Sequence, residues 1–319
     1  MVAVNKAKLK PVSVSFTSMG SPCEVKIMTR DPQQQAYVLQ LAVNEVKRLN
    51  DKYSRYNPAS LLSRINQAAG TGERILLDEE TNAIMNYADV CYRESDGLFD
   101  ITSGVLRQAW NFKNLNGPFE LPAQSLIEEL LTRVGWQQVY WQDSQFALPK
   151  PGMEIDFGGI VKEYAADAVA ALCLKEGIKS GLVNLGGDIK IIGSAQDNDT
   201  WSVFIQNPDK SKKQHAELSI RSGAVATSGV YERFIEHKGK RYSHLLNPKT
   251  GWPIEHCAAS LTVLAEHCII AGSVSTIGLL QGRECATWMQ DNTDLPFWCC
   301  LDNGQLITRS CQDLTLIKP

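Results

Sequence analysis

Several features that would assign a protein to a particular class are scarce in this chain of 319 residues. No apolar run approaches the roughly 18 residues expected of a membrane span. The N-terminal stretch MVAVNKAKLKPVSVSF has neither the long apolar segment nor the small-residue cleavage site of a secretory signal. Basic charge is not in excess either, because 32 Lys and Arg face 35 Asp and Glu, for a net charge of -3. We therefore expect no membrane-spanning segment and no nucleic-acid partner.

Cysteine is more plentiful, but its spacing shows no disulfide framework. The nine cysteines are an odd number and follow no regular interval. Cys299 and Cys300 are adjacent, so on a strand they point to opposite faces and are not expected to chelate a metal together. Four others lie among apolar neighbours and are expected as small core residues: Cys23, Cys91, Cys173 and Cys268. Reduced thiols favour a cytoplasmic protein, or a periplasmic one if an export signal has been removed.

The nucleotide-binding signatures GxGxxG and GxxxxGKS/T are missing as well. The chain has instead EIDFGGIVKEYAAD, residues 154–167, which predicts a short strand, a Gly-Gly turn and a helix. The free N–H groups at a helix start favour an anion, Gly158 and Gly159 let a ligand approach the backbone, and Lys162 adds positive charge. A plain strand-to-helix turn explains the same residues, so this stretch alone leaves both interpretations open.

A second Gly-Gly pair lies in GLVNLGGDI, residues 181–189, with Asn184 and Asp188 beside it. Glycine inside a strand marks a bulge or a close approach of another backbone or a ligand. One such pair is easily explained as a bulge. Two pairs beside polar side chains favour a nucleotide-sized ligand.

The segment RYSHLLNPKTG, residues 241–251, places His244 on a strand that leads into a turn with Asn247 and Thr250. Turn chemistry explains the asparagine and the glycine, but it does not explain the histidine. His244 is the best general-base candidate, because a neutral imidazole is available near pH 7. The other histidines lie in polar, loop-like settings and are expected at the surface: His215, His237, His256 and His267.

Two more segments carry clustered polar groups. VATSGVYERF, residues 225–234, contains Thr227 and Ser228. This pair of hydroxyls is typical of a phosphate-binding site, and equally of an ST-turn. DGLFDITSGV, residues 96–105, sets Asp96 and Asp100 around Phe99. Acids beside an aromatic ring fit a sugar or a ring ligand, and they fit helix caps equally well.

The pattern of elements predicts an α+β protein, either one domain over residues 1–319 or two subdomains. Helical periodicity covers residues 33–52, 78–94 and 123–135, the stretch from the Gly-Gly turn to about residue 175, and 266–282. Alternating segments predict strands at 12–16, 23–28 and 153–157 and several short strands after residue 180. Hairpin turns are expected at Lys238-Gly239 and Asn303-Gly304.

Taken in order, eight segments of this chain resemble the FAD:protein FMN transferases. These are the ApbE-like flavin transferases, formerly called thiamine biosynthesis lipoproteins. The resemblance runs from about Met19 to Gln281, and each segment alone is a weak signal. The segments are MGSPCEVKI, SRYNPASLLSRIN, DGLFDITSGVL, IDFGGIVKEYAAD, LVNLGGDI, ATSGVYERF, RYSHLLNPKTGWPI and CIIAGSVSTIGLLQG.

The resemblance implies an ApbE-like fold of mixed, mainly antiparallel sheets and packed helices that binds FAD and Mg²⁺. It implies cleavage of FAD, release of AMP and attachment of FMN to a Thr or Ser of an acceptor protein. By this family pattern Met19 and Tyr56 pack on the flavin, and residues 96–104, including Asp96, Gly97, Phe99 and Asp100, line the nucleotide site. The reacting end is lined by Thr227, Ser228, His244, Asn247 and Thr250, with His244 and Thr250 as catalytic residues. The diphosphate side is assigned to Gly158, Gly159, Lys162 and Asp188.

This chain departs from the family pattern at the metal site. The late helix of the family reads A-D-x-x-x-T, with its Asp and Thr binding the metal, whereas here Thr276 remains and Gly272 replaces the acid. Val230 also stands where an Asp is usual, and Glu163 where Gly is common. Asn247 for Asp and Lys249 for Arg are milder exchanges. By the family pattern, Thr276 and the backbone carbonyl at about Val161 hold the metal. Because Mg²⁺ prefers carboxylate oxygens, we expect Glu163 to replace part of the missing acids.

Three hypotheses follow from this comparison. In the first, the chain is an active flavin transferase in which Glu163 partly replaces the missing acids. In the second, it binds FAD without transferring FMN, as a carrier or regulator. In the third, the nucleotide site is degraded and the chain is a scaffold. The surviving Gly-Gly turns, His244 and Thr276 favour the first two, and the family's own activity puts the transferase first.

Overall fold

The fold is organised around one large antiparallel sheet, described here from a computed structural model. Residues 10–112, 119–193, 200–208, 216–231 and 233–310 are described, together with the backbone of 316–317. The sheet has eight strands in the order β1-β2-β6-β7-β10-β13-β14-β15, and every neighbouring pair is antiparallel. Their bounds are β1 Val12–Ser18, β2 Ser21–Ile27, β6 Ser180–Leu185, β7 Asp188–Gly193, β10 Ala224–Gly229, β13 Ser260–Ala265, β14 Phe297–Cys300 and β15 Leu306–Arg309.

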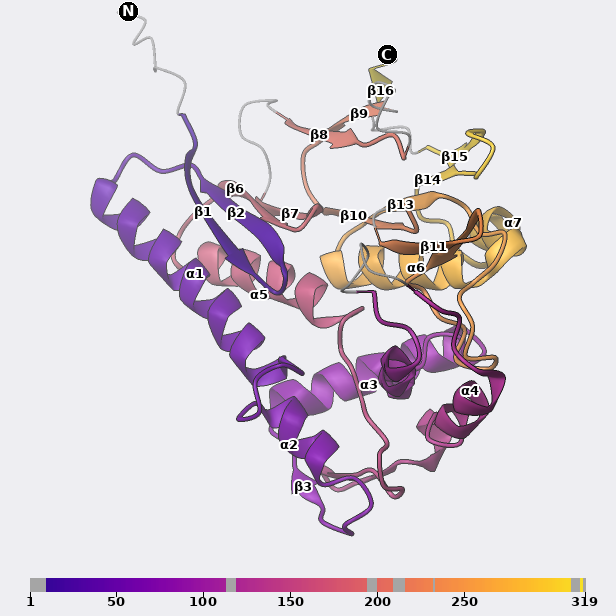
Figure 1. The fold of residues 1–319 in the computed structure, drawn as a ribbon. Coiled ribbons are helices and arrows are strands. Elements are labelled where there is room, and N and C mark those ends of the chain that lie inside the picture. The colour runs from indigo at the N-terminus through magenta and orange to yellow at the C-terminus, as the bar shows by residue number, and fades with distance from the viewer. Residues whose placement is uncertain are drawn as a thin grey trace, which may run out of the picture.

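Both faces of this sheet are covered (Figure 1). On one face lies a three-stranded sheet, which packs through apolar side chains of β8 and β9 against β6, β7 and β10. On the other face lie helices, with α5 and α6 running side by side in the middle. The bounds of these elements are β8 Trp201–Ile205, β9 Ala216–Ile220, β16 Leu316–Ile317, α1 Pro32–Tyr53, α5 Val161–Lys175, α6 Cys268–Leu280 and α7 Cys285–Asn292.

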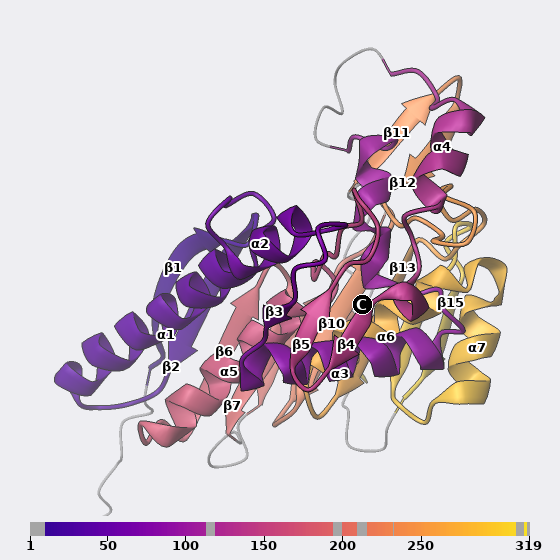
Figure 2. The same cartoon turned by 90° about the horizontal axis from the view of Figure 1, so that it is seen from below.

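A further layer lies beneath α5 and α6, on the side away from the sheet (Figure 1). Figure 2 shows α4 beside the hairpin β11–β12 at one end of the molecule, where Trp110, Ile127 and Tyr242 form a small aromatic core. The elements of this layer are α2 Leu61–Gln67, β3 Ile75–Leu76, α3 Glu79–Glu94, η1 Ile101–Gln108, α4 Gln124–Leu131, η2 Trp136–Gln138, β4 Tyr140–Gln142 and β5 Gln145–Ala147. The remaining elements are the hairpin strands β11 Phe234–His237 and β12 Lys240–Ser243, and η3 Gly282–Glu284, which follows α6.

Helix α6 carries no charged residue on any side because it lies between two layers. One side packs on β10 and β13, and on the other Tyr87 of α3 bonds Ser273 through their hydroxyls at 2.5 Å. Tyr87 also donates to the carbonyl of Ile269 at 3.1 Å. A helix that is covered on both sides has no solvent face to carry charges, which explains the uncharged run CIIAGSVSTIGLL.

Most predicted elements are confirmed, but the strand predicted at 153–157 is wrong. The segment is extended, yet no neighbouring strand pairs with it in the described structure. The side-chain amide of Asn66 instead bonds the backbone N–H and C=O of Ile155, at 2.8 and 3.0 Å. Asp156 N–H donates to the carbonyl of Ile101. The backbone groups of this segment therefore bond a side chain of α2 and the first residue of η1, and alternation of residues cannot reveal such partners.

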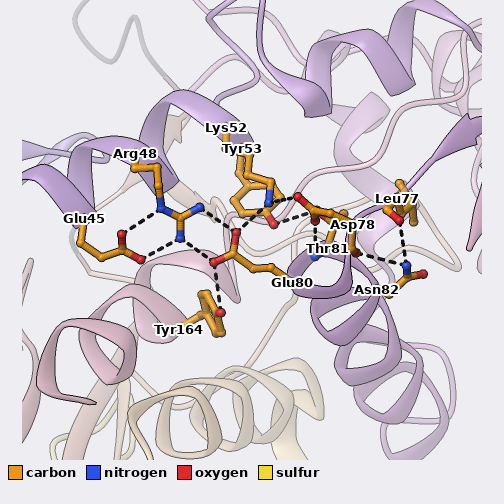
Figure 3. Close-up of polar contacts among 10 residues, drawn as sticks. All are labelled: Glu45, Arg48, Lys52, Tyr53, Leu77, Asp78, Glu80, Thr81, Asn82 and Tyr164. Carbon is orange, nitrogen blue, oxygen red and sulfur yellow. Dashed lines mark hydrogen bonds and ion pairs between the residues drawn. The ribbon is translucent and has the colours of Figure 1, made fainter. Parts of the chain in front are cut away.

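An ion-pair network joins α1, the start of α3 and α5 (Figure 3). Arg48 forks onto Glu80 with hydrogen bonds of 2.9 and 2.6 Å, and Lys52 bonds Glu80 at 2.7 Å and Asp78 at 2.6 Å. Tyr164 of α5 donates to Glu80 at 3.2 Å. The hydrogen bonds from Arg48, followed by those from Lys52, lower the pKa of Glu80 from 4.5 to about 2. The network therefore holds α1, the start of α3 and the first turn of α5 together.

Glu80→Gln is expected to lower the free energy of unfolding at pH 7 by about 1 kcal/mol, because much of the ion pairing is screened by solvent. Since folding depresses the pKa of Glu80, its contribution is complete above pH 4.5 and is lost as the pH falls toward 2. Urea unfolding at pH 7 and pH 3 would measure both effects. Glu45→Gln, which removes another partner of Arg48 on the same helix, should cost less than half as much. A variant of Glu80 as stable as the parent at pH 7 would refute the role of the network.

Candidate functional site

The start of α5 lies beside the turn between β6 and β7, so the two Gly-Gly segments meet in space. Lys162 bridges the two, because its Nζ is paired with a carboxylate oxygen of Asp188 and lies 3.0 Å from Oε1 of Glu163. Glu163 and Asp188 are buried, with 6% and 4% of their surface exposed. Two carboxylates and one ammonium group therefore share a small, largely dry volume.

Glu163 occupies space that a side chain at position 272 would need. A Cβ added to Gly272 would lie 2.4 Å from Cγ of Glu163, which is closer than atoms can approach. The glycine in α6 is thus what allows the glutamate in α5 to lie where it does. Oε2 of Glu163 is buried, and it is the one buried side-chain polar atom in the described structure without a hydrogen-bond partner. A buried carboxylate oxygen without a donor is unfavourable unless a cation or another ligand supplies one.

Hydroxyl groups of β10 and α6 lie at the end of the same region. Ser228 bonds the hydroxyls of Ser275 and Thr276, at 2.8 and 2.9 Å. Thr227 donates its backbone N–H to Asp188 at 3.2 Å. The predicted residues therefore fall into two neighbouring groups: Thr227 is joined through Asp188 to Lys162, and Ser228 is joined to Thr276. The hydroxyl of Thr227 bonds that of Thr262 on β13 instead, at 2.9 Å.

The fit of this region to a divalent cation can be judged from its donor atoms. No group of three or more His, Cys, Asp or Glu in the described parts of the chain is placed to hold a metal. Mg²⁺ is often bound by one or two carboxylates together with phosphate oxygens of a substrate. Glu163, with its unpaired Oε2, and the hydroxyl of Thr276 fit that pattern, and Val161 places a backbone carbonyl in the first turn of α5.

The hairpin turn between β1 and β2 lies against the same region. A Cβ added to Gly186 would be 2.7 Å from Oγ of Ser21 and 3.7 Å from Cδ of Lys162. The turn itself places Met19 at φ 51°, followed by Gly20 at φ 71°. A left-handed conformation is costly for methionine, but positive φ at both central residues is what a two-residue hairpin turn requires, so the turn accounts for it.

The Gly158–Gly159 turn packs directly on residue Phe99. A Cβ on Gly159 would lie 3.1 Å from Cζ of this ring, so a larger residue would push the ring away. The carboxylate of Asp156 accepts the N–H of Gly158 at 2.9 Å and pairs with Arg55. Arg55 in turn lies over the ring of Tyr56, with its guanidinium carbon 5.0 Å from the ring centre. Tyr56 is 61% exposed, as expected for a ring that can stack on a ligand.

Residues 96–100 divide into an exposed part and a buried part. Asp96 and Gly97 form a left-handed turn, and Lys249 pairs with the exposed carboxylate of Asp96 at 2.7 Å. This pair connects the 247–251 turn with the segment that carries Phe99. Asp100 is different, because its carboxylate caps η1 at Thr102 and accepts the N–H of Trp136. Burial nevertheless raises the pKa of Asp100. Its contacts are those of a helix cap, so a direct role in ligand binding gains no support from them.

His244 has a defined tautomer. Its Nδ1 lies 3.2 Å from the carbonyl of Arg233, which can only accept, so Nδ1 carries the proton and Nε2 keeps a free lone pair. Phe112 contacts the imidazole edge to face, with ring centres 6.4 Å apart. Burial lowers the pKa of His244 below 6.5. The side chain is thus held as a neutral imidazole near pH 7, which is the form that a general base requires.

The turn after His244 borders a surface hollow of about 470 Å³. Asn247 shapes the turn by accepting the N–H of Lys249 on its side chain and that of Gly251 on its carbonyl, both at 2.8 Å. Thr250 is exposed beside it. Across the hollow lie the end of α6 and η3, including Arg283. Of the residues predicted at the reacting end, Asn247 and Thr250 thus face an open surface that a second molecule can reach, whereas Thr227, Ser228 and His244 do not line this hollow.

The sequence did not reveal several residues that organise this site. Arg55 and Asp156 hold the Gly-Gly turn, but a charged pair far apart in the chain leaves no local pattern. The predicted His215 lies outside the described residues. His237 is not a free surface histidine, because its Nδ1 bonds the carbonyl of Phe119 at 3.0 Å.

Comparison with known proteins gives one consistent result. The model of the ApbE family matches residues 19–297. A FAD:protein FMN transferase of Vibrio cholerae is 27% identical over 288 residues, which are 89% of this chain and 86% of that protein. One from Klebsiella pneumoniae is 31% identical over 260 residues, covering 79% of this chain and 73% of the relative.

The fold is similar to that of solved structures as well. The crystal structure of the ApbE protein from Thermotoga maritima superimposes with a TM-score of 0.85 at 27% identity, covering 94% of this chain and 97% of that chain. The α+β architecture with its antiparallel sheets is therefore the ApbE fold predicted from the sequence. Because the family model spans most of the chain, this protein belongs to the ApbE family.

Proposed function

We propose that this protein is an FAD:protein FMN transferase that cleaves FAD, releases AMP and attaches FMN to a Thr or Ser of an acceptor protein. The observation that carries the proposal is the meeting of both Gly-Gly turns around Lys162, with the unpaired Oε2 of Glu163 beside it. Backbone N–H groups at the start of α5 favour the negative charge of a diphosphate. The two carboxylates exceed the one ammonium group, so the arrangement suits a diphosphate that is bound together with a divalent cation.

Each residue group then has a role in the reaction. Lys162 and the turn at Gly158 and Gly159 bind the diphosphate, while Met19 and Tyr56 hold the flavin ring. Glu163, Thr276 and the carbonyl of Val161 would hold Mg²⁺, which when bound neutralises charge on the phosphate oxygens.

His244 takes the proton from the acceptor hydroxyl at Nε2. The hydroxyl oxygen bonds the phosphorus of the FMN half, and the bond to the bridging oxygen breaks so that AMP leaves. Asn247 and Thr250 line a surface hollow, and there the acceptor segment would enter.

A second candidate function is FAD binding without transfer. It is favoured by the pairing of Lys162 with both Asp188 and Glu163, which already neutralises part of the charge that a metal would otherwise compensate. In this case the protein would carry flavin or regulate a partner that binds it.

Incubation of the purified protein with FAD and an acceptor protein of an FAD:protein FMN transferase, with Mg²⁺ or with EDTA, separates these functions. We expect AMP to form in the presence of Mg²⁺, measured by chromatography, while flavin absorbance follows the bound cofactor. FAD that stays bound and uncleaved in the presence of the acceptor would refute the transferase and support the binding protein. Neither AMP nor retained flavin would refute both functions and leave the scaffold.

A further inference from the structure

Two cysteines in the C-terminal part of the sheet lie in direct contact. Cys285 is the first residue of α7, and Cys299 is the third residue of β14. Their sulfur atoms are 3.7 Å apart, and both residues are buried, with 1% and 0% of their surface exposed. The surrounding side chains include Leu261 and Phe297, and none of this cluster belongs to the site described above.

We propose that Cys285 and Cys299 form a reversible disulfide when the protein meets a small-molecule or protein disulfide. The two sulfur atoms are already at van der Waals distance, so small rotations of the side chains bring them to bonding distance. The bond would tie the start of α7 to the strand beneath it.

The two thiols differ in how readily they react. A hydrogen bond from the thiol of Cys285 lowers the pKa of Cys299, whereas the same bond raises that of Cys285. Thiols elsewhere in the core behave differently, because burial raises the pKa of Cys173 to about 12. Cys299 is therefore the thiol of this pair that ionises first and attacks an oxidant.

The exchange is balanced with oxidised glutathione as the oxidant. The thiolate of Cys299 attacks one sulfur of the glutathione disulfide, forming a mixed disulfide and releasing one glutathione thiolate. The thiol of Cys285 then loses its proton and displaces the second glutathione. Two cysteine thiols are oxidised, one glutathione disulfide is reduced, and the two released glutathiones take up the two protons.

The oxidant reaches this buried pair through local opening of the sheet end. Helix α7 has eight residues and no side-chain cap at its N-terminus, and β15 is the last strand of the large sheet. Short uncapped helices and edge strands open at a lower free energy than the rest of a domain. Transient release of α7 would expose Cys285 and Cys299 together.

The test is to oxidise the folded protein with glutathione disulfide, block free thiols and map the cysteines without reduction. Trypsin leaves both cysteines in one peptide, since no Lys or Arg lies between Arg283 and Arg309. A protease that cuts before aspartate separates them at Asp291 and Asp294. We expect the Cys285 and Cys299 peptides to be recovered as one cross-linked species, and the Tm of the oxidised protein to rise by about 5 °C over the reduced form.

Cys285→Ala and Cys299→Ala should each abolish the cross-link and the oxidation-dependent rise in Tm. Cys173→Ala, a change at an equally buried thiol on α5, should keep both. Either outcome below would overturn the proposal: complete alkylation of both cysteines after oxidation of the folded parent, or pairing of Cys299 with another cysteine. Because the readouts are a peptide map and a Tm, neither depends on flavin transfer.

Discussion

Replacement of Glu163 by glutamine is expected to weaken Mg²⁺ binding about 100-fold and to slow metal-dependent AMP release by a similar factor. Glutamine keeps the shape of the side chain but removes the negative charge beside Lys162 and the unpaired oxygen Oε2. Titration of the protein with Mg²⁺ in the presence of FAD would measure the affinity, and AMP release would measure the rate. Affinity and rate equal to those of the parent would show that Glu163 is no metal ligand.

Gly272→Asp provides the matched control for this experiment. On its own the change should also weaken Mg²⁺ binding, since its Cβ would displace Glu163. In the double variant Gly272→Asp with Glu163→Gly, the carboxylate moves from α5 to α6 while the space is kept. We expect this swap to recover most of the affinity. If the single variant bound Mg²⁺ as tightly as the swap, the two positions would not compete for one space.

His244→Ala is expected to lower the rate of FMN transfer about 1,000-fold while FAD remains bound. The expected loss follows from the free lone pair on Nε2 of the neutral imidazole. The bond from Nδ1 to the carbonyl of Arg233 keeps the proton on Nδ1 and so leaves Nε2 able to accept one. Because burial lowers the pKa of His244, the base form persists at pH 6.5 and is lost only at lower pH. The pH–rate profile of the parent should therefore fall on an acid limb below pH 6.5, and that limb should vanish in the variant.

His237→Ala is the appropriate comparison, because His237 lies on the hairpin that ends one residue before His244 and also bonds a backbone carbonyl through Nδ1. Its transfer rate should stay within a few-fold of the parent. Equal losses in the two variants would assign the effect to the hairpin rather than to proton transfer. An unchanged rate in His244→Ala would exclude this residue as the base.

The elements that the sequence predicts well are those whose signal is local. The long helix α1 carries a clear 3.6-residue period, and the turns at Lys238-Gly239 and Asn303-Gly304 connect antiparallel strands as expected. Helix α2 and the 3-10 helix η1 were not predicted as such, because both are short and polar residues interrupt their periodicity. Segment 153–157 was mispredicted since alternation marks burial of one face, not pairing with a neighbour.

For the site, the sequence identified unusual residues but not their relations in space. It marked Glu163 and Gly272 as departures from the family, yet 109 positions of chain separate them, and only the fold places them in contact. The same holds for Lys162 and Asp188. Asp100 shows the opposite case, because one pattern of residues fits either a ligand or a cap, and its contacts are those of a cap.

The order of strands in the large sheet has a consequence for how the chain acquires its structure. β2 pairs with β6, so the whole chain between Ile27 and Ser180 must be synthesised before these two strands can pair. Pairings between distant segments slow folding, because the entropy of a long loop is lost before the contacts form. The hairpins β6–β7 and β14–β15 are local and can form early. During synthesis from the N-terminus, the β1–β2 hairpin is therefore complete before β6 has been made. The free edge of β2 stays exposed and prone to aggregation until β6 emerges.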